Sequence, residues 1–275
     1  MLPDFLICGT EKGGTSALFH YLKAHPEVFM PEAKELNFFN FNYAEGIEWY
    51  KRYFAERGEA TACGEASPMY MAYPEVPRRI AQTIPEAKLL FVLRDPAERA
   101  YSNYWFNVNR GVQYPQESFS KTIRQATGYR RYLWKGFYSD QIAMFLPHFS
   151  RDQFHFIVTE EMGEDTPGVL KRCFRFLDLA DHEPEVRKRH NRAQLPRNEV
   201  ASAMLNVVLP VQKALRPLLP ARIDGRLKQT VRSTFFTNKE KPPMLEEDRA
   251  YLQDVYRDSN KHLAELIGQD LSMWT

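Results

Sequence analysis

Four short apolar runs, separated by longer segments with helical spacing, limit most strongly what this chain can fold into. The runs cover residues 5–8, 60–64, 88–93 and 154–158. Short buried strands that alternate with helices are typical of βαβ units in a mostly parallel sheet. We therefore predict an α/β fold of the P-loop type, with a mostly parallel β-sheet and helices on both of its faces. In such sheets the binding site lies at the carboxyl ends of the strands.

The helical segments surround these runs. Apolar residues recur at helical spacing most clearly over 245–267, from Leu252 and Val255 to Leu263 and Leu266. We predict helices over 15–25, 47–56, 75–83, 96–109, 118–126, 138–147, 168–178, 199–216 and 245–267. Residues 180–198 and 217–243 are rich in proline and charge, and we interpret them as candidate lid or acceptor-binding loops. A single domain is expected over 1–275.

Composition excludes several classes of protein. The chain has 275 residues and a net charge of only +2 without a long basic block, which argues against a nucleic-acid or membrane-surface protein. No segment approaches the ~20 apolar residues of a membrane span, and no secretory signal is present, so we expect a cytoplasmic chain. The three cysteines, Cys8, Cys63 and Cys173, show no metal-ligand spacing and are interpreted as reduced packing residues.

A glycine-rich loop, Gly9-Thr-Glu-Lys-Gly-Gly-Thr-Ser16, follows the first run and opens a helix. Its backbone N–H groups can converge on an anion, and the helix N-terminus adds partial positive charge. Lys12 supplies a full charge, while Thr15 and Ser16 can cap the helix or donate to phosphate oxygens. In the nucleotide-triphosphate loop the lysine would stand at position 15. Its place at 12 weakens a kinase or ATPase interpretation and suits a phosphosulfate. A plain glycine turn is the alternative.

A second anion site is predicted after the third run. Asp95 is a good N-cap, and Pro96 is a good first helical residue. Arg94, together with the Ser102 hydroxyl on the helix, can hold a separate phosphate, as a 3′-phosphorylated nucleotide requires. The alternative for Arg94 is an ion pair with Asp95 or Glu98. The run ends in Arg-Asp rather than directly in Asp, so the magnesium ligand of a Walker-B strand is missing.

Four stretches in this order resemble the sulfotransferases that use 3′-phosphoadenosine 5′-phosphosulfate (PAPS). Among them the likeness is to the heparan-sulfate-type glycan enzymes and their bacterial relatives. The stretches are 12–18, residues 34–39 with 46–50, residues 64–68 with Tyr70, and 93–104. Residues 34–39, here termed the acceptor segment, resemble the part of those enzymes that meets the acceptor.

The resemblance implies a donor site and a catalytic base. The phosphosulfate would be held by Lys12, Gly13, Gly14, Thr15 and Ser16, and the 3′-phosphate by Arg94 and Ser102. Glu35 stands where the family has its base, which would take the acceptor proton during an in-line displacement. Lys12 would stabilise the charge that grows on the leaving oxygen. No metal is needed in this mechanism.

Two departures from the family pattern concern the acceptor and the nucleotide. Ala66 stands where some members have a lysine. The basic C-terminal loop that closes over the nucleotide in the glycan enzymes has no clear match, and Arg232, Asn238 and Lys239 are the candidates to replace it.

Three other residues compete with Glu35 as the base: His20, Glu65 and His190. Glu65 could instead orient Lys12 or a substrate, since it ends a predicted strand. His190 lies in the basic stretch 187–192, which is interpreted as a solvated face or as a contact for an anionic acceptor.

The acceptor class is ordered by the same resemblance. A sugar hydroxyl comes first, an alcohol on a lipid or polyketide second, and an amine third. Most of the aromatic residues between 38 and 50 are expected in the core, with one or two lining the acceptor cleft. The competing hypotheses are a P-loop phosphotransferase that uses ATP and magnesium, and a nucleotide-binding protein without catalytic activity.

Overall fold

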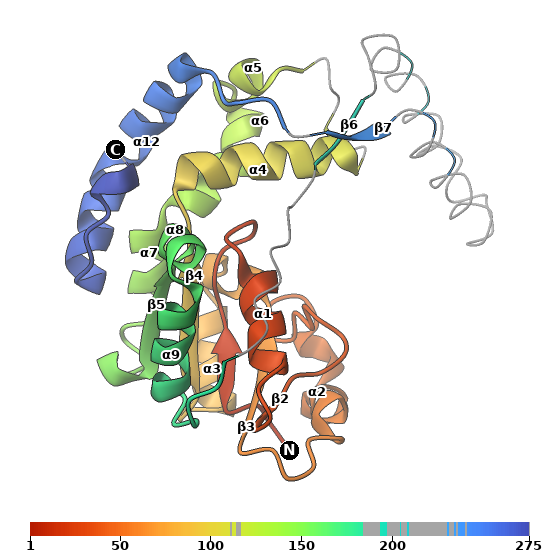
Figure 1. The fold of residues 1–275 in the computed structure, drawn as a ribbon, viewed down its shortest axis with the longest axis vertical. Coiled ribbons are helices and arrows are strands. Elements are labelled where there is room, and N and C mark those ends of the chain that lie inside the picture. The colour runs from red at the N-terminus through yellow and green to blue at the C-terminus, as the bar shows by residue number, and fades with distance from the viewer. Residues whose placement is uncertain are drawn as a thin grey trace. The chain divides into compact units, whose positions relative to one another are not determined.

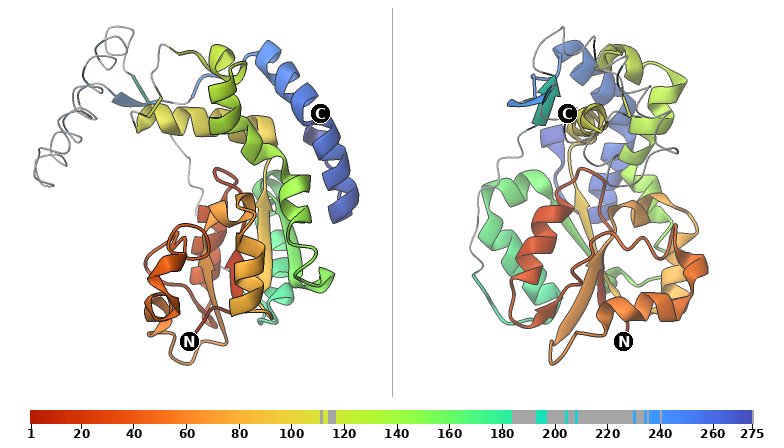
Figure 2. Two further views of the ribbon diagram at one scale, coloured as in Figure 1. Left: turned by 180° about the vertical axis from the view of Figure 1, so that it is seen from behind. Right: turned by 90° about the vertical axis from the view of Figure 1, so that its right-hand side faces the viewer.

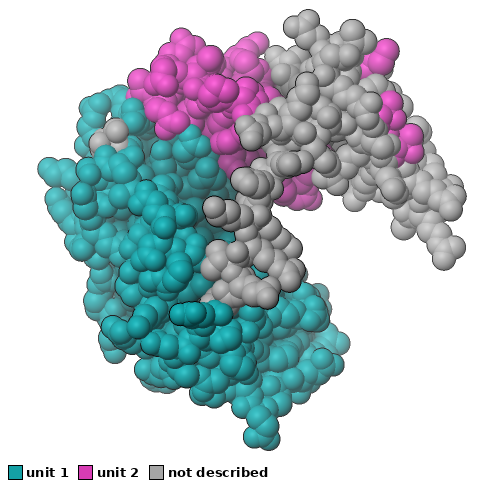
Figure 3. Space-filling model, viewed as in Figure 1, with its two compact units in different colours: residues 1–99, 135–187, 252–275 teal, residues 100–134, 188–251 magenta. Residues whose placement is uncertain are grey.

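The described part of the chain divides into two compact units (Figure 3). The structure, a computed structural model, describes residues 1–110, 112–113, 117–183, 193–196, 236–239 and 241–274, and the single positions 204, 208, 230 and 234. The first unit comprises residues 1–99, 135–187 and 252–275, and the second comprises 100–134 and 188–251. The expectation of a single domain over 1–275 stays a prediction.

The first unit contains a five-stranded sheet in the order β2-β3-β1-β4-β5, with every neighbouring pair parallel (Figure 1). Strands β4 (Lys88–Leu93) and β5 (Phe154–Val158) have the predicted bounds. Strand β1 (Phe5–Ile7) is one residue shorter than predicted, and β3 (Ala62–Ala66) begins and ends two residues later. Strand β2 (Val28–Phe29) was not predicted, because two residues are too few to form an apolar run.

Alternate residues of each strand pack into separate cores on the two faces of the sheet, as period-two geometry requires. In β4, Leu89 and Phe91 face one core and Leu90 and Val92 the other. The first core includes residues of α3 (Val76–Thr83), α7 (Tyr138–Ala143) and the end of α12 (Glu246–Ile267). The second includes residues of α1 (Thr15–Lys23) and α9 (Thr166–Phe176) (Figure 2). The fold class is therefore as predicted.

Most predicted helices are present with shifted ends. The segment predicted over 47–56 consists of α2 (Ile47–Lys51) and a 3₁₀ turn, Arg52–Phe54. The segment predicted over 118–126 ends early, as α5 (Phe119–Ile123), and a short α6 (Ala126–Gly128) follows. Helix α8 (Thr159–Glu164) was not predicted. The helix expected over 199–216 lies outside the described residues except at 204 and 208.

The second unit is built on α4 (Pro96–Asn109), which begins in the first unit. Tyr104 of α4 packs edge-on against Phe119 of α5 with 5.4 Å between the ring centroids. Arg124 pairs with the buried Asp248 of α12 at 2.5 Å. Strands β6 (Ala193–Pro196) and β7 (Phe236–Lys239) form an antiparallel pair, so the two segments expected as loops each contain a strand. The rest of both segments, apart from 180–183, 230, 234 and 241–243, lies outside the described residues.

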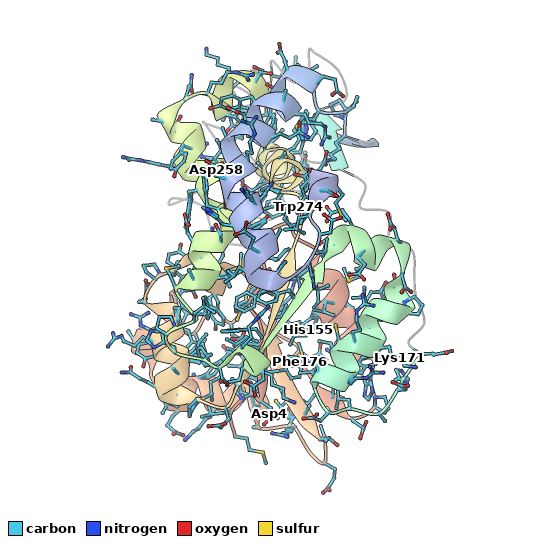
Figure 4. The ribbon with its side chains drawn as sticks, turned by 90° about the vertical axis from the view of Figure 1, so that its left-hand side faces the viewer. Asp4, His155, Lys171, Phe176, Asp258 and Trp274 are labelled. Carbon is cyan, nitrogen blue, oxygen red and sulfur yellow. The ribbon has the colours of Figure 1, made fainter. Side chains whose placement is uncertain are left out.

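Two side-chain contacts of the first unit involve His155 and Trp274 (Figure 4). His155 of β5 stacks on Phe176 of α9 with 5.0 Å between ring centroids. Burial and the nearby Arg172 lower the pKa of His155 to about 4. Trp274 is buried, and its indole N–H donates to the Glu160 carboxylate at 3.3 Å.

The expected state of the cysteines is confirmed, since Cys8, Cys63 and Cys173 are buried and free. None of the helices in the described ranges combines the length and the apolar content that crossing a bilayer requires.

Candidate functional site

The glycine loop between β1 and α1 is curled by left-handed backbone at two positions, Lys12 (φ 69°) and Gly14 (φ 94°). The loop lies against β4, where the Thr10 N–H donates to the Val92 carbonyl at 2.9 Å. A Cβ at Gly9 would lie 2.6 Å from the Val92 nitrogen, so only glycine allows this approach. Helix α1 begins at Thr15, directly after Gly14. The predicted glycine loop and helix start are therefore present, and anion binding by the loop stays a prediction.

The loop is also tied to β5. The Thr159 hydroxyl, at the start of α8, shares its one proton between the Gly13 carbonyl and the Leu93 carbonyl, the latter at 2.8 Å. One hydroxyl thus joins the loop to the ends of β4 and β5. This places the loop at the carboxyl edge of the sheet, where the parallel-strand pattern predicts the site.

Two lysines flank the start of α1. Lys12 is half-buried in the loop, and Lys34 extends from the acceptor segment so that its Nζ lies 2.6 Å from Ser16 Oγ. Burial lowers the pKa of both amines; Glu35 opposes this lowering at each, while Lys12 adds to it at Lys34. Lys34 was missed in the sequence analysis, because no motif assigns it and its partner is eighteen positions away in the chain.

Arg94 follows β4 and lies beside the loop. Its guanidinium donates to the Lys12 carbonyl at 3.3 Å and pairs with Glu98 at 3.3 Å. The Glu98 alternative is thus observed together with contact to the anion loop. Asp95 caps α4, since its carboxylate accepts the Ala97 N–H at 2.8 Å. Ser102 is half-buried in the second unit, so its pairing with Arg94 on one phosphate stays a prediction.

The acceptor segment carries Glu35 close to the loop. The Glu35 side chain is 52% exposed, and its carboxylate lies 3.8 Å from the Lys34 amine. Its N–H donates to the Ala66 carbonyl at 3.0 Å, which ties the segment to the end of β3. Glu35 and Asn37 both have left-handed backbone, with φ of 60° and 49°. Such conformations cost about 1–3 kcal/mol each and persist only where the surroundings hold them.

Three of the aromatic residues of this region lie in the core, and the expectation that one or two line the acceptor cleft stays a prediction. Phe38, Phe39 and Tyr50 are buried in the core. Phe41 is 59% exposed and contacts Tyr73 edge-on, with 5.1 Å between ring centroids.

The rival bases have other surroundings. His20 is exposed on α1 and meets the Phe19 ring edge-on. Glu65 is only 1% exposed, and its carboxylate accepts three side-chain hydroxyls. Burial raises its pKa to about 7 against the lowering effect of these hydrogen bonds. Glu65 does not contact Lys12, because its hydrogen-bond partners lie on the acceptor segment, α2 and the turn after β3, and the alternative that it orients a substrate stays a prediction. His190 lies outside the described residues.

The positions that depart from the family pattern are only partly described. Ala66 is buried at the end of β3. Asn238 and Lys239 belong to β7, without a described side chain, and Arg232 lies outside the described residues. Within the described ranges, no group of three or more His, Cys, Asp or Glu residues could hold a metal ion.

Comparison with known proteins decides the family. Residues 2–263 match the family described as "Sulfotransferase domain". This chain belongs to the sulfotransferase family. The family indicated by the four sequence stretches is therefore confirmed, and the glycine loop, Arg94 and Glu35 lie within the matched residues.

The curated relatives of this sulfotransferase include two mouse enzymes. Bifunctional heparan sulfate N-deacetylase/N-sulfotransferase 4 is 31% identical over 297 residues, which cover 99% of this chain and 31% of that protein. Heparan sulfate glucosamine 3-O-sulfotransferase 3A1 is 32% identical over 182 residues, or 65% of this chain and 46% of that protein. The sulfotransferase thus spans less than half the length of both relatives.

Among solved structures, a sulfotransferase from Alicyclobacillus acidocaldarius matches with a TM-score of 0.72 and 24% identity. The match covers 100% of this chain and 99% of that one. It confirms the fold.

Proposed function

We propose that this sulfotransferase moves a sulfuryl group from PAPS to an acceptor hydroxyl, with Glu35 as the base. The observation that carries the proposal is the charge arrangement at the glycine loop. Lys12, Lys34 and Arg94 bring three cationic side chains to the loop, and the carboxylate of Glu35 lies 3.8 Å from one of them. A site for a multiply charged anion therefore adjoins a half-exposed base.

The loop fits a phosphosulfate. Gly9 and Gly13 leave no room for a Cβ, and the N–H groups of Thr15 and Ser16 at the start of α1 precede the first N–H that bonds back to the Gly14 carbonyl. Such groups bind anions without a metal. Arg94 has the planar, fixed donor geometry that suits a phosphate, here the 3′-phosphate of the donor.

Each of these residues has its own role in the transfer. Glu35 accepts the proton of the acceptor hydroxyl while the oxygen of that hydroxyl forms a bond to sulfur. The bond between sulfur and the 5′-phosphate oxygen breaks, and Lys12 stabilises the negative charge on that oxygen. Lys34, between Ser16 and Glu35, supplies charge on the side of the loop from which the acceptor oxygen attacks.

Acceptor choice follows the family relationship. Both relatives named above carry heparan sulfate in their names, which supports a sugar as the acceptor, and the 3-O-sulfotransferase supports a sugar hydroxyl as the first acceptor class. The N-sulfotransferase is named for transfer to a nitrogen, which keeps an amine among the acceptor classes. An alcohol on a lipid or polyketide is the second class, and an amine the third.

The donor site is tested by calorimetry with 3′-phosphoadenosine 5′-phosphate (PAP) without magnesium, against adenosine 5′-phosphate and ATP. We expect binding that needs the 3′-phosphate and that weakens in Arg94→Ala and Lys12→Ala. The control is Lys171→Ala, which removes an exposed lysine paired with Asp181. Tighter binding of ATP with magnesium would instead favour a phosphotransferase.

The base is tested with PAPS and a panel of acceptors: N-desulfated heparin, a long-chain alcohol and an amino sugar. General-base catalysis is worth ~10²–10⁴-fold, so Glu35→Gln should lose that much rate and keep its PAP affinity. PAP binding without transfer to any acceptor would favour a nucleotide-binding protein that lacks catalytic activity.

A further inference from the structure

A buried carboxylate, Glu65, lies under the acceptor segment. It belongs to β3 and is 1% exposed. Its Oε1 accepts hydrogen bonds from the hydroxyls of Tyr50 at 3.0 Å and Tyr70 at 2.5 Å, and its Oε2 accepts one from Ser67 at 2.9 Å. The N–H of Leu36 is a fourth donor. Both oxygens are therefore committed within the protein.

Two of those hydroxyls, from Tyr70 and Ser67, also accept hydrogen bonds from the backbone of the acceptor segment. Tyr70 Oη accepts the N–H of Phe38 at 2.8 Å and the N–H of Phe39 at 3.3 Å. Ser67 Oγ accepts the N–H of Asn37 at 3.0 Å. Each backbone N–H from Leu36 to Phe39 therefore donates either to Glu65 or to a hydroxyl that itself donates to Glu65.

The direction of these bonds depends on the carboxylate. A hydroxyl has one proton to donate, and both Tyr70 and Ser67 donate theirs to Glu65, so their oxygens are left to accept. Above its pKa of about 7 the carboxylate is ionised and only accepts, and it then fixes which way each hydroxyl points. Without it, Tyr70 and Ser67 could turn their protons toward the backbone, where N–H groups cannot accept them.

The segment needs such support. Glu35 and Asn37 have left-handed backbone on either side of Leu36, which L residues rarely adopt. The N–H of Glu35 donates to the carbonyl of Ala66, the residue next to Glu65 in β3. Every backbone N–H from 35 to 39 is therefore accepted by β3 itself or by a hydroxyl that donates to Glu65.

We propose that Glu65 is a positioning residue for sulfuryl transfer: it holds the acceptor segment in the conformation that presents Glu35 to the acceptor. This rests on the proposed role of Glu35 as the base. Glu65 itself takes no proton from the acceptor, because it is buried and its oxygens are occupied.

The test is amide hydrogen exchange resolved to single residues, on the full chain. Glu65→Gln keeps the shape but offers one accepting oxygen and an NH₂ group, which must face a hydroxyl. Losing hydrogen bonds to a charged group is expected to speed exchange at 36–39 by about 10- to 100-fold. Tyr70→Phe should speed exchange at Phe38 and Phe39 but not at Asn37, and Ser67→Ala should do the reverse.

A second readout connects the segment to catalysis. With PAPS and N-desulfated heparin, Glu65→Gln should lower kcat by at least ~10-fold, while PAP affinity by calorimetry stays at the wild-type value. Glu35→Gln is the control, with lower kcat and unchanged exchange at 36–39. Unchanged exchange in all three hydrogen-bond variants would overturn the proposal, and so would faster exchange with wild-type kcat. Full transfer by Glu35→Gln would instead reject the base, whatever exchange shows for Glu65.

Discussion

Glu65 should make the stability of the folded chain fall as pH rises, and replacing it by glutamine should remove that effect. Burial raises the pKa of Glu65 to about 7 from an ordinary 4.5, because the hydrogen bonds from Tyr70, Ser67 and Tyr50 only partly oppose it. Between these values the folded chain keeps a proton that the unfolded chain has released. The free energy of unfolding therefore decreases with pH across that interval.

The magnitude follows from the two pKa values. An interval of about 2.5 between 4.5 and about 7, at 1.36 kcal/mol per pKa unit, amounts to about 3 kcal/mol. The ionisable groups that face Glu65 are Tyr50, Tyr70 and Cys8, and burial raises the pKa of all three. These three groups stay neutral below pH 8, so they do not change how the free energy of unfolding depends on pH in this interval.

The assay is urea unfolding of wild type and Glu65→Gln at pH 5, 6, 7 and 8. Between pH 5 and pH 8 the difference in unfolding free energy should shift in favour of the variant by about 2.5 kcal/mol. His155 gives wild type the opposite slope, since its depressed pKa lowers stability as pH falls from 6.5 toward 4. That contribution is common to both proteins and cancels in the difference.

A matched control is Glu32→Gln, which changes a carboxylate whose side chain is 93% exposed. Its difference from wild type should be flat with pH. If the Glu65→Gln difference is equally flat, or moves in favour of wild type, the reasoning from burial is refuted.

Three further predictions concern the glycine loop and its lysines. Gly9→Ala brings a Cβ to 2.6 Å from the Val92 nitrogen, and should cost about 1–3 kcal/mol in urea unfolding. Gly163→Ala meets open space in a helix and should gain up to ~1 kcal/mol; equal effects would contradict this account of the loop. Lys34→Met should weaken PAP binding by ~10-fold or more through a lost charged hydrogen bond, and wild-type affinity in calorimetry would contradict that role. Because burial lowers the pKa of Lys12 and Lys34, PAP binding at pH 9 should take up protons; a binding enthalpy that is the same in buffers of different ionisation enthalpy would count against this.

The sheet could be predicted because most of its strands are indicated by the pattern of apolar residues within the strand itself. Strands β4 and β5 are continuous apolar runs, as strands covered on both faces must be. In β3 the polar Glu65 interrupts the apolar pattern, which moved the predicted end of the strand two residues too early. Strand β2 exists through its pairing with Ala62 and Cys63, and two residues carry no periodicity.

The candidate site likewise has parts that local sequence predicts and parts that only the fold brings together. The glycine loop and Arg94 each follow a strand and open a helix, so their place at the carboxyl edge could be predicted. The contact of Lys34 with Ser16 joins two segments that no spacing rule relates. The role of Glu65 is likewise invisible in sequence, because its partners lie on three separate elements and become neighbours only in the fold.

The anchoring of Trp274 has a practical consequence for handling the protein. Glu160 accepts the Trp274 indole N–H with one oxygen and the Asp95 N–H with the other at 3.1 Å, one residue beyond Arg94. Replacing Trp274, or deleting residues 272–274, therefore acts through two hydrogen bonds on the residue next to the predicted 3′-phosphate ligand. A change to this segment during protein preparation should therefore alter the nucleotide affinity.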